Sequence, residues 1–194
     1  MAKREEDIMR ASVKIFAEKG YQDTHIADIV EEVGIAKGTF YLYFKSKKDV
    51  FLSLIDSHTN SIREDINISF LNSLEGEDLK EIIKGFLRGF FLSYFKNKNL
   101  TSIIFREAIA LDSDFEEKMQ NLHQIKIDIM SELHEFLLNG NYGVREQKFE
   151  VFSHMILGII ESYILKSLMI YKDNIDLEEI IEGASDYIYR AIKE

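Results

Sequence analysis

Four lysines and no acidic side chain lie between Val33 and Lys48, a stretch that also carries the hydroxyl groups of serine, threonine and tyrosine. Ammonium and hydroxyl groups donate hydrogen bonds to phosphate oxygens and to the polar edges of bases. Lys47 closes the stretch together with Lys48, where both are placed to meet backbone phosphate. The stretch therefore predicts a locally basic surface that contacts a nucleic acid.

Residues 36–44 are expected to form a short helix with two different sides. At about 100° per residue, Phe40 and Phe44 fall together as the buried edge. The other side offers donors and a glycine that lets the backbone approach a partner closely. Its positions and their flanks are Lys37, Gly38, Thr39, Tyr41, Leu42 and Tyr43.

Two further helices must position this short helix. The first ends near Gly20, where glycine supplies the left-handed stop. The second is expected to have Thr24 as its N-cap and to end at Gly34. Two short helices joined by a tight glycine turn and supported by a preceding helix form a helix-turn-helix, which we predict near residues 24–45. The apolar face of the second helix consists of Ile26, Ile29, Val30 and Val33.

Residues 4–52 closely resemble the N-terminal domain of the tetracycline-repressor (TetR) family. The resemblance rests on Gly20-Tyr21, Thr24, Ile29-Val30, Gly34-Ile35 and the run AKGTFYLYFKSKKDVF. It implies an all-α protein that binds double-stranded DNA at a palindromic operator, most often as a repressor, with activation as the alternative. The rest of the chain matches that family only in length and helical character.

The resemblance also implies which side chains touch DNA. Hydroxyl and ammonium groups at four positions suit phosphate contacts, which fix the register. Two positions near the start of the recognition helix are better placed for base edges, and Gly38 allows close approach. Leu42 departs from the family pattern: it either packs on a thymine methyl group or is turned away by a rotation of the helix. The phosphate set is Thr24, Tyr41, Tyr43 and Lys47, and the base set is Lys37 and Thr39.

Composition is consistent with a helical regulator. The chain has no proline and no cysteine, which favours helices with short connections, excludes disulfides and thiolate sites, and fits a cytoplasmic protein. Acidic and basic groups cancel in residues 1–50, so the whole net charge of −10 belongs to residues 51–194. We therefore expect an acidic body with one basic contact surface. The apolar stretch Met155–Tyr171 is too short and too charged for a membrane span.

Beyond residue 46 the pattern predicts only helices, near 46–73, 77–96, 100–111, 114–139, 145–171 and 176–192, which makes about nine helices in total. Their breaks are marked by polar or glycine-containing turns, including Asp112-Ser113 and Asp173-Asn174. We expect a DNA-binding domain over residues 1–46 and a ligand-binding and dimerisation domain over residues 47–194.

Seventeen of the 23 aromatic residues lie beyond residue 50, and residues 82–95 form a broad apolar face with Gly85 and Gly89 on it. These glycines permit a close helix approach or leave space for a guest. Most of the aromatics are expected to be ordinary core, but the resemblance implies an inducer site among these helices, for a hydrophobic or amphipathic molecule. The candidate lining residues are Phe86, Phe90, Tyr94, Phe105, Met130, Met155 and Tyr163.

The last two helices are expected to form a homodimer. Phe152–Tyr171 is apolar nearly all round, and Leu177–Ile192 carries a second apolar stripe with Gly183 and Ala184 in it. The resemblance implies that two copies pair these helices as a four-helix interface. Glu161 interrupts the apolar stretch, and we expect it to pair with Arg106 or a lysine; binding a cationic or hydroxyl-bearing ligand is the alternative.

The sequence leaves two other functions as alternatives. An enzyme would need a nucleotide loop, a zincin pair or a nucleophile elbow, and none of these motifs is present. A metal site built from His123, His154 and Glu107 or Glu161 stays open, although isolated histidines are more often structural. The remaining alternative is an architectural or protein-partnered DNA-binding protein with a filled core and no inducer. No cofactor is expected.

Overall fold

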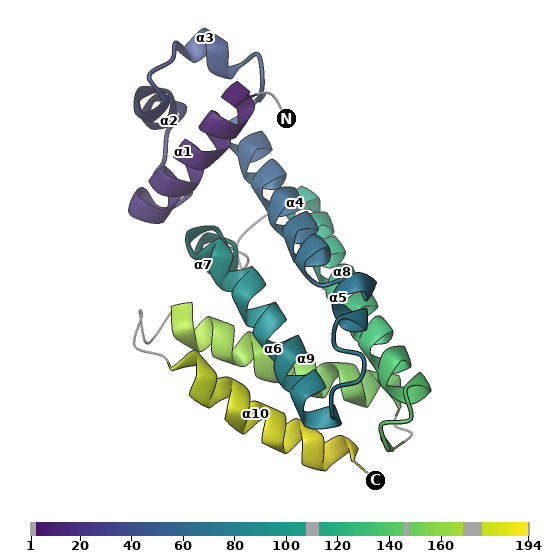
Figure 1. Cartoon of the computed structure of the whole chain (residues 1–194). Helices are drawn as coiled ribbons and strands as arrows, with labels where there is room; N and C mark the ends of the chain where they lie inside the picture. Colours follow the sequence, from purple (N-terminus) through teal and green to yellow (C-terminus); the bar gives the residue numbers. More distant parts are fainter. Residues whose placement is uncertain (1–2, 108–112, 146–147, 169–175, 194) are drawn as a thin grey trace. The chain divides into compact units, whose positions relative to one another are not determined.

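A computed structural model describes residues 3–107, 113–145, 148–168 and 176–193. Within these ranges the regular elements are ten helices, apart from an isolated β-bridge between Val144 and Lys193 (Figure 1). The all-α prediction is therefore confirmed. The helices are α1 (Lys3–Lys19), α2 (Ile26–Val33), α3 (Lys37–Phe40), α4 (Lys47–Asp65), α5 (Ile68–Asn72), α6 (Leu79–Lys96), α7 (Lys98–Glu107), α8 (Ser113–Asn139), α9 (Phe149–Lys166) and α10 (Leu177–Ile192).

The helix predicted over residues 46–73 is interrupted and becomes α4 and α5. Asn67 has extended backbone, and its side-chain oxygen accepts from the N–H groups of Ser69 and Phe70 at 2.9 and 3.1 Å. This is N-capping, which starts a new helix. The predicted break at Asp173-Asn174, the first residue of that at Asp112-Ser113, and the far ends of the helices predicted over 100–111 and 145–171 lie outside the described residues.

The chain forms two compact units. The first unit comprises residues 1–60 and 97–120, and the second comprises residues 61–96 and 121–194. The units do not follow the predicted boundary at residue 46. Phe51 and Ile55 of α4, and Leu100 and Ile103 of α7, are buried in the same apolar core as Phe40. Because this core draws on α4 and α7, the helix-turn-helix is part of a larger packed body than expected.

In the second unit, α6 packs against both α9 and α10 (Figure 1). Side chains of the protein itself, Leu74 and Phe70, pack against the two glycines of α6, so no space is left there for a ligand. A Cβ atom at Gly85 would lie 2.8 Å from Leu74, and one at Gly89 would lie 2.7 Å from the ring of Phe70. The close-approach reading of these glycines is therefore the one that the structure supports.

This packing predicts that the effect of Gly89→Ala on stability changes sign when the ring of Phe70 is removed. Gly89→Ala should lower the free energy of unfolding by about 1–2 kcal/mol, because overpacking outweighs the helix-propensity gain. In a Phe70→Ala background the ring is gone, and the same alanine should instead stabilise by up to about 1 kcal/mol. Urea unfolding of the four proteins measures both values. An equal effect of Gly89→Ala in both backgrounds would contradict the contact.

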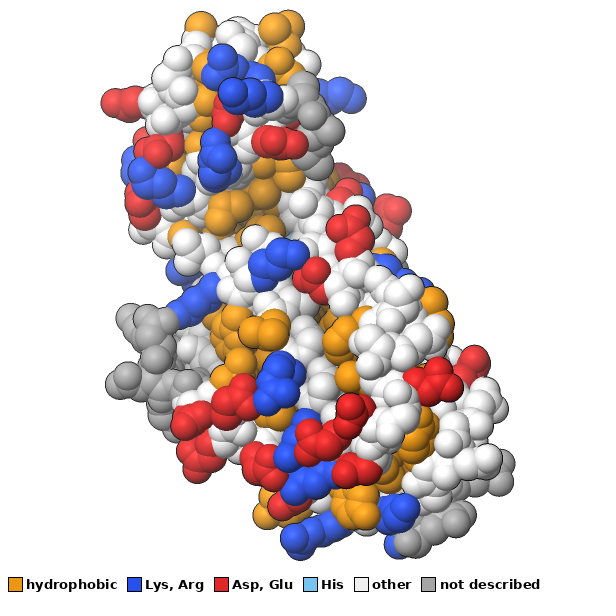
Figure 2. Space-filling view, viewed as in Figure 1, with side chains coloured by type: hydrophobic (Ala, Val, Ile, Leu, Met, Phe, Trp, Pro, Cys, Tyr) orange, Lys and Arg blue, Asp and Glu red, His pale blue; other side chains and the backbone are white. Residues whose placement is uncertain are grey.

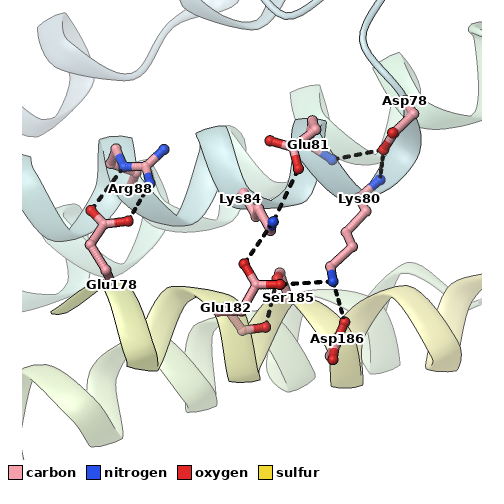
Figure 3. A network of polar contacts seen from close by, with 9 residues as sticks. All are labelled: Asp78, Lys80, Glu81, Lys84, Arg88, Glu178, Glu182, Ser185 and Asp186. Carbon is pink, nitrogen blue, oxygen red and sulfur yellow. Dashed lines mark hydrogen bonds and ion pairs between the residues drawn. The ribbon is translucent and has the colours of Figure 1, made fainter. Parts of the chain in front are cut away.

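A row of ion pairs joins α6 to α10 (Figure 3). Lys80 contacts Glu182 at 2.8 Å and Asp186 at 2.6 Å, and Lys84 contacts Glu182 at 2.6 Å. Arg88 binds Glu178 one turn further along. Each pair is at least partly exposed and worth little alone, but together the pairs favour one placement of α10 along α6. We call this row the α6–α10 ladder.

The ladder predicts a dependence of stability on pH. Hydrogen bonds from Lys80 and Lys84 lower the pKa of Glu182 from 4.5 to about 2. A lowered carboxyl pKa stabilises the folded state above the unfolded pKa, and this contribution is lost as the pH falls from about 4.5 to about 2. The thermal midpoint of Glu182→Gln should therefore lie below that of the unchanged protein at pH 6 and converge with it towards pH 2. Glu179→Gln, at an exposed position of the same helix and outside the ladder, is the matched control for the removal of one carboxylate.

Candidate nucleic-acid interface

Gly34 makes the turn between α2 and α3. Its φ of 72° lies in the left-handed region, which glycine adopts without strain. Its N–H donates to the carbonyl of Glu31 at 3.1 Å, and the N–H of Ile35 donates to the carbonyl of Val30 at 3.0 Å. These bonds satisfy the last carbonyls of α2 and redirect the chain into α3. The predicted helix-turn-helix is thus formed.

Two phenylalanines anchor the recognition helix. Phe40 and Phe44 are buried, and their ring centroids lie 6.0 Å apart. Regular α-helix extends only over Lys37–Phe40, but Phe44 still donates its N–H to the carbonyl of Phe40 at 3.0 Å. The helical turn therefore continues far enough to place both rings on one edge, as predicted.

The opposite side of this segment faces solvent. Lys37 and Gly38 are exposed and Thr39 is half-buried. Tyr41 and Tyr43 are 49% and 38% exposed, so both residues are accessible to a partner. Blue lysine or arginine side chains and orange hydrophobic side chains gather at the end of the first unit where α3 lies (Figures 1 and 2). Five of the seven predicted DNA-contacting positions are therefore displayed together on one segment.

Thr24 differs from expectation. Its side chain is only 1% exposed, and its hydroxyl donates to the carbonyl of Gly20 at 2.6 Å. The N-cap of α2 is His25, not Thr24. Asp28, three residues later, accepts from the N–H of His25 at 2.8 Å and pairs with Lys19, and these contacts lower the pKa of its carboxyl group. The sequence signal for this cap is Asp28, an acidic residue at the third position of the helix.

Lys47 lies at the start of α4 and is half-buried. Its ammonium donates to the carbonyls of Tyr21 and Gln22 and lies 4.5 Å from the centre of the Tyr21 ring. The neighbouring Lys48 pairs with Asp114 at 2.5 Å. Lys47 therefore has a structural role: its hydrogen bonds connect α4 to the segment between α1 and α2.

The predicted ligand-binding residues do not form one group. Phe105 belongs to the first unit and the other six to the second. On α6, Phe86, Phe90 and Tyr94 are fully buried, with centroid distances of 5.4 and 6.1 Å along the row. Met130 of α8 is also buried, whereas the α9 residues Met155 and Tyr163 are half-buried.

A polar cluster accompanies this aromatic row. Glu161 binds Lys126 of α8, whose side chain is only 10% exposed, so the expected pairing with a lysine is confirmed. Burial raises the pKa of the Tyr94 hydroxyl, and the negative charge of Glu161 raises it further. The second unit thus combines a buried aromatic row with an ammonium, a carboxylate and a phenol.

The metal site that the sequence left open is not assembled within the described ranges. His123 and His154 are both exposed. Within the parts of the chain that the structure describes, no three His, Asp or Glu side chains are grouped as metal ligands. No helix of those parts combines the length and apolarity needed to cross a bilayer.

Comparison with known proteins agrees with this geometry. Residues 8–54 match the model of the bacterial regulatory proteins of the tetR family. The HTH-type transcriptional regulator YerO of Bacillus subtilis is 30% identical over 184 residues, which cover 93% of this chain and 61% of YerO. The fatty acid metabolism regulator protein of B. subtilis is 36% identical over 74 residues, or 38% of this chain and 34% of that protein. The chain thus spans less than two thirds of the length of these relatives.

Solved structures share the fold over nearly the whole chain. The fatty acid degradation regulator FadR of Bacillus halodurans has a TM-score of 0.72 at 21% identity, covering 97% of this chain and 95% of that one. FadR of B. subtilis, solved in complex with stearoyl-CoA, has a TM-score of 0.73 at 23% identity, covering 94% and 96%. A helix-turn-helix near the N-terminus followed by further helices is the fold that this chain shares with these regulators. Residues 8–54 thus carry the helix-turn-helix of the bacterial regulatory proteins of the tetR family, and the chain as a whole shares the fold of solved regulators of that family.

Proposed function

We propose that the chain is a transcriptional regulator that binds a palindromic DNA operator as a homodimer and is released from it by a hydrophobic small molecule. One observation carries the proposal. The exposed side of the segment from Lys37 to Tyr43 presents an ammonium group, a bare glycine and two tyrosine hydroxyls, while Phe40 holds the segment in the core. Donors on the exposed side of a recognition helix match the major groove and its phosphates.

The contacts divide into two roles. Lys37 and Thr39 lie in the first turn of α3 and are proposed to reach base edges. Tyr41, Tyr43 and Lys47 are proposed to bind phosphate and to fix the register. Thr24 acts through the loop that it holds, because its hydroxyl already serves the carbonyl of Gly20.

Selection of bound fragments from a random DNA library by the purified full chain tests the proposal. Thr39→Val keeps the shape of the side chain and removes the hydroxyl. At one operator position it should therefore change the free-energy difference between the preferred base and the other bases by about 1–3 kcal/mol. Lys47→Met should weaken binding to all sequences alike and reduce the salt slope by about 0.9. Equal loss of specific and non-specific binding in Thr39→Val would refute its base-reading role, and no enrichment of any sequence would refute the proposal.

The homodimer is proposed to form through α9 and α10. Val151, Gly158 and Leu165 repeat every seven residues on α9 and are exposed, two of them at 59% and 44%. On α10, Gly183 has open space around it and Tyr187 is 76% exposed. Seven-residue repeats of apolar and small residues suit helix-to-helix pairing. A two-fold pair would match the symmetry of a palindrome.

The inducer is proposed to be hydrophobic with a polar end. Support comes from the buried aromatic row on α6 beside the Lys126–Glu161 pair. Because a FadR of similar fold was solved with stearoyl-CoA, acyl-CoA esters are the first class to titrate against the protein–DNA complex. Release by long-chain esters, but not by coenzyme A alone, would support this ligand class. A complex unaffected by any apolar ligand would favour the regulator without an inducer.

A further inference from the structure

Leu42 is 80% exposed, more than any other large hydrophobic side chain that the structure shows at the surface. A single exposed leucine is ordinary on a protein surface. This one lies in the recognition segment, between two tyrosines that are also exposed. The helix rotation that would bury Leu42 does not occur in this structure.

The backbone places Leu42 on a distinct ridge. Gly38 precedes it by four residues, so both lie on one side of a helical turn, opposite the buried Phe40 and Phe44. A Cβ atom added to Gly38 would meet nothing within 4 Å. This side of the segment thus has open space at Gly38 and one exposed isobutyl group at Leu42.

Groove chemistry limits what an isobutyl group can recognise. It neither donates nor accepts a hydrogen bond, so it gains nothing from a phosphate or from the polar edge of a base. The one apolar feature that base pairs present in the major groove is the C5 methyl group of thymine. We propose that Leu42 determines operator sequence by packing on a thymine methyl group in each half-site. The inference rests on the proposed DNA binding and deepens it by naming the chemical group that is read.

The size of the effect follows from the burial of one methyl group. Removing that methyl should weaken binding about fourfold per half-site. For a palindrome bound by a dimer, the two losses multiply to about fifteenfold. The same removal should have no effect on a protein that lacks the isobutyl group, and this difference identifies Leu42 as the reader.

Replacement of thymine by deoxyuridine removes the methyl group and keeps every hydrogen-bonding atom of the base. The full chain is first used to select an operator from a random library. Each thymine of the selected half-site is then replaced in turn, symmetrically in both half-sites, and the Kd is measured for the unchanged protein, Leu42→Ala and Leu42→Met. Methionine keeps an apolar side chain of similar size and serves as the conservative variant.

The expected result is one thymine position at which deoxyuridine weakens binding about fifteenfold in the unchanged protein. Leu42→Ala should lose this sensitivity at that position and at no other, and Leu42→Met should keep most of it. Methyl sensitivity that is unchanged in Leu42→Ala, or absent at every position, would overturn the inference while DNA binding itself stands. Failure of the unchanged protein to select any sequence would overturn the proposed function and this inference together.

Discussion

Replacing Phe40 by alanine is expected to lower the free energy of unfolding of the first unit by about 3–5 kcal/mol, because it empties a fully buried aromatic site. The ring contacts Tyr41 edge-on at 5.5 Å and Phe44 at 6.0 Å, so its loss also frees the segment that displays the DNA-contacting groups. A domain is stable by only about 5–15 kcal/mol. Phe40→Ala should therefore lose operator binding and much of its thermal stability together.

Leu42→Ala is the matched control, two positions away in the same segment. Its side chain is 80% exposed, so the free energy of unfolding should change by less than about 0.5 kcal/mol. Urea unfolding measured on both variants separates the anchor from the surface. A Leu42→Ala protein as unstable as Phe40→Ala would show that the two sides of the segment have been assigned the wrong way round.

Gly183→Arg is expected to raise the dissociation constant of the homodimer by about a hundredfold or more. In a two-fold interface each substitution occurs twice, and juxtaposed like charges cost several kcal/mol. The position has open space in the single chain, and arginine has a better helix propensity than glycine, so the subunit itself should stay folded. Sedimentation equilibrium over a range of protein concentrations measures the change.

Ser69→Arg provides the control for added charge, since Ser69 is exposed on α5 and not on the proposed face. It should leave the dimer intact. Operator affinity should fall in Gly183→Arg but not in Ser69→Arg, because a monomer holds only one half-site. A dimer that survives Gly183→Arg unchanged would place the interface elsewhere.

Local signals accounted for much of the fold. The predicted start of a helix at residue 46 agrees with α4, where the Ser46 hydroxyl accepts from the N–H of Asp49 at 3.0 Å. Such caps are legible because the partners are three residues apart. The α2 cap at His25 was missed because threonine is the stronger capping residue by type, although here its hydroxyl bonds back to Gly20.

Contacts between distant residues were harder to predict. A lysine partner for Glu161 was expected, but its position, Lys126, depends on how α8 and α9 pack. Likewise, two readings of Gly89 were equal on spacing alone, and only the placement of Phe70 decides between them. The surface of the recognition segment was predicted from helical angles, whereas the exposure of Leu42 needed the actual rotation of the turn.

The two carbonyl bonds of Lys47 have a consequence for DNA affinity. A phosphate that recruits this ammonium would have to compete with the carbonyls of Tyr21 and Gln22, so the contact would be an exchange of partners, not a net addition. The measured contribution of Lys47 to affinity should then be smaller than that of a lysine whose ammonium is hydrated before DNA binds. Binding would then also free the carbonyls of Tyr21 and Gln22, so the connection between α1 and α2 would lose two hydrogen bonds when the operator is bound.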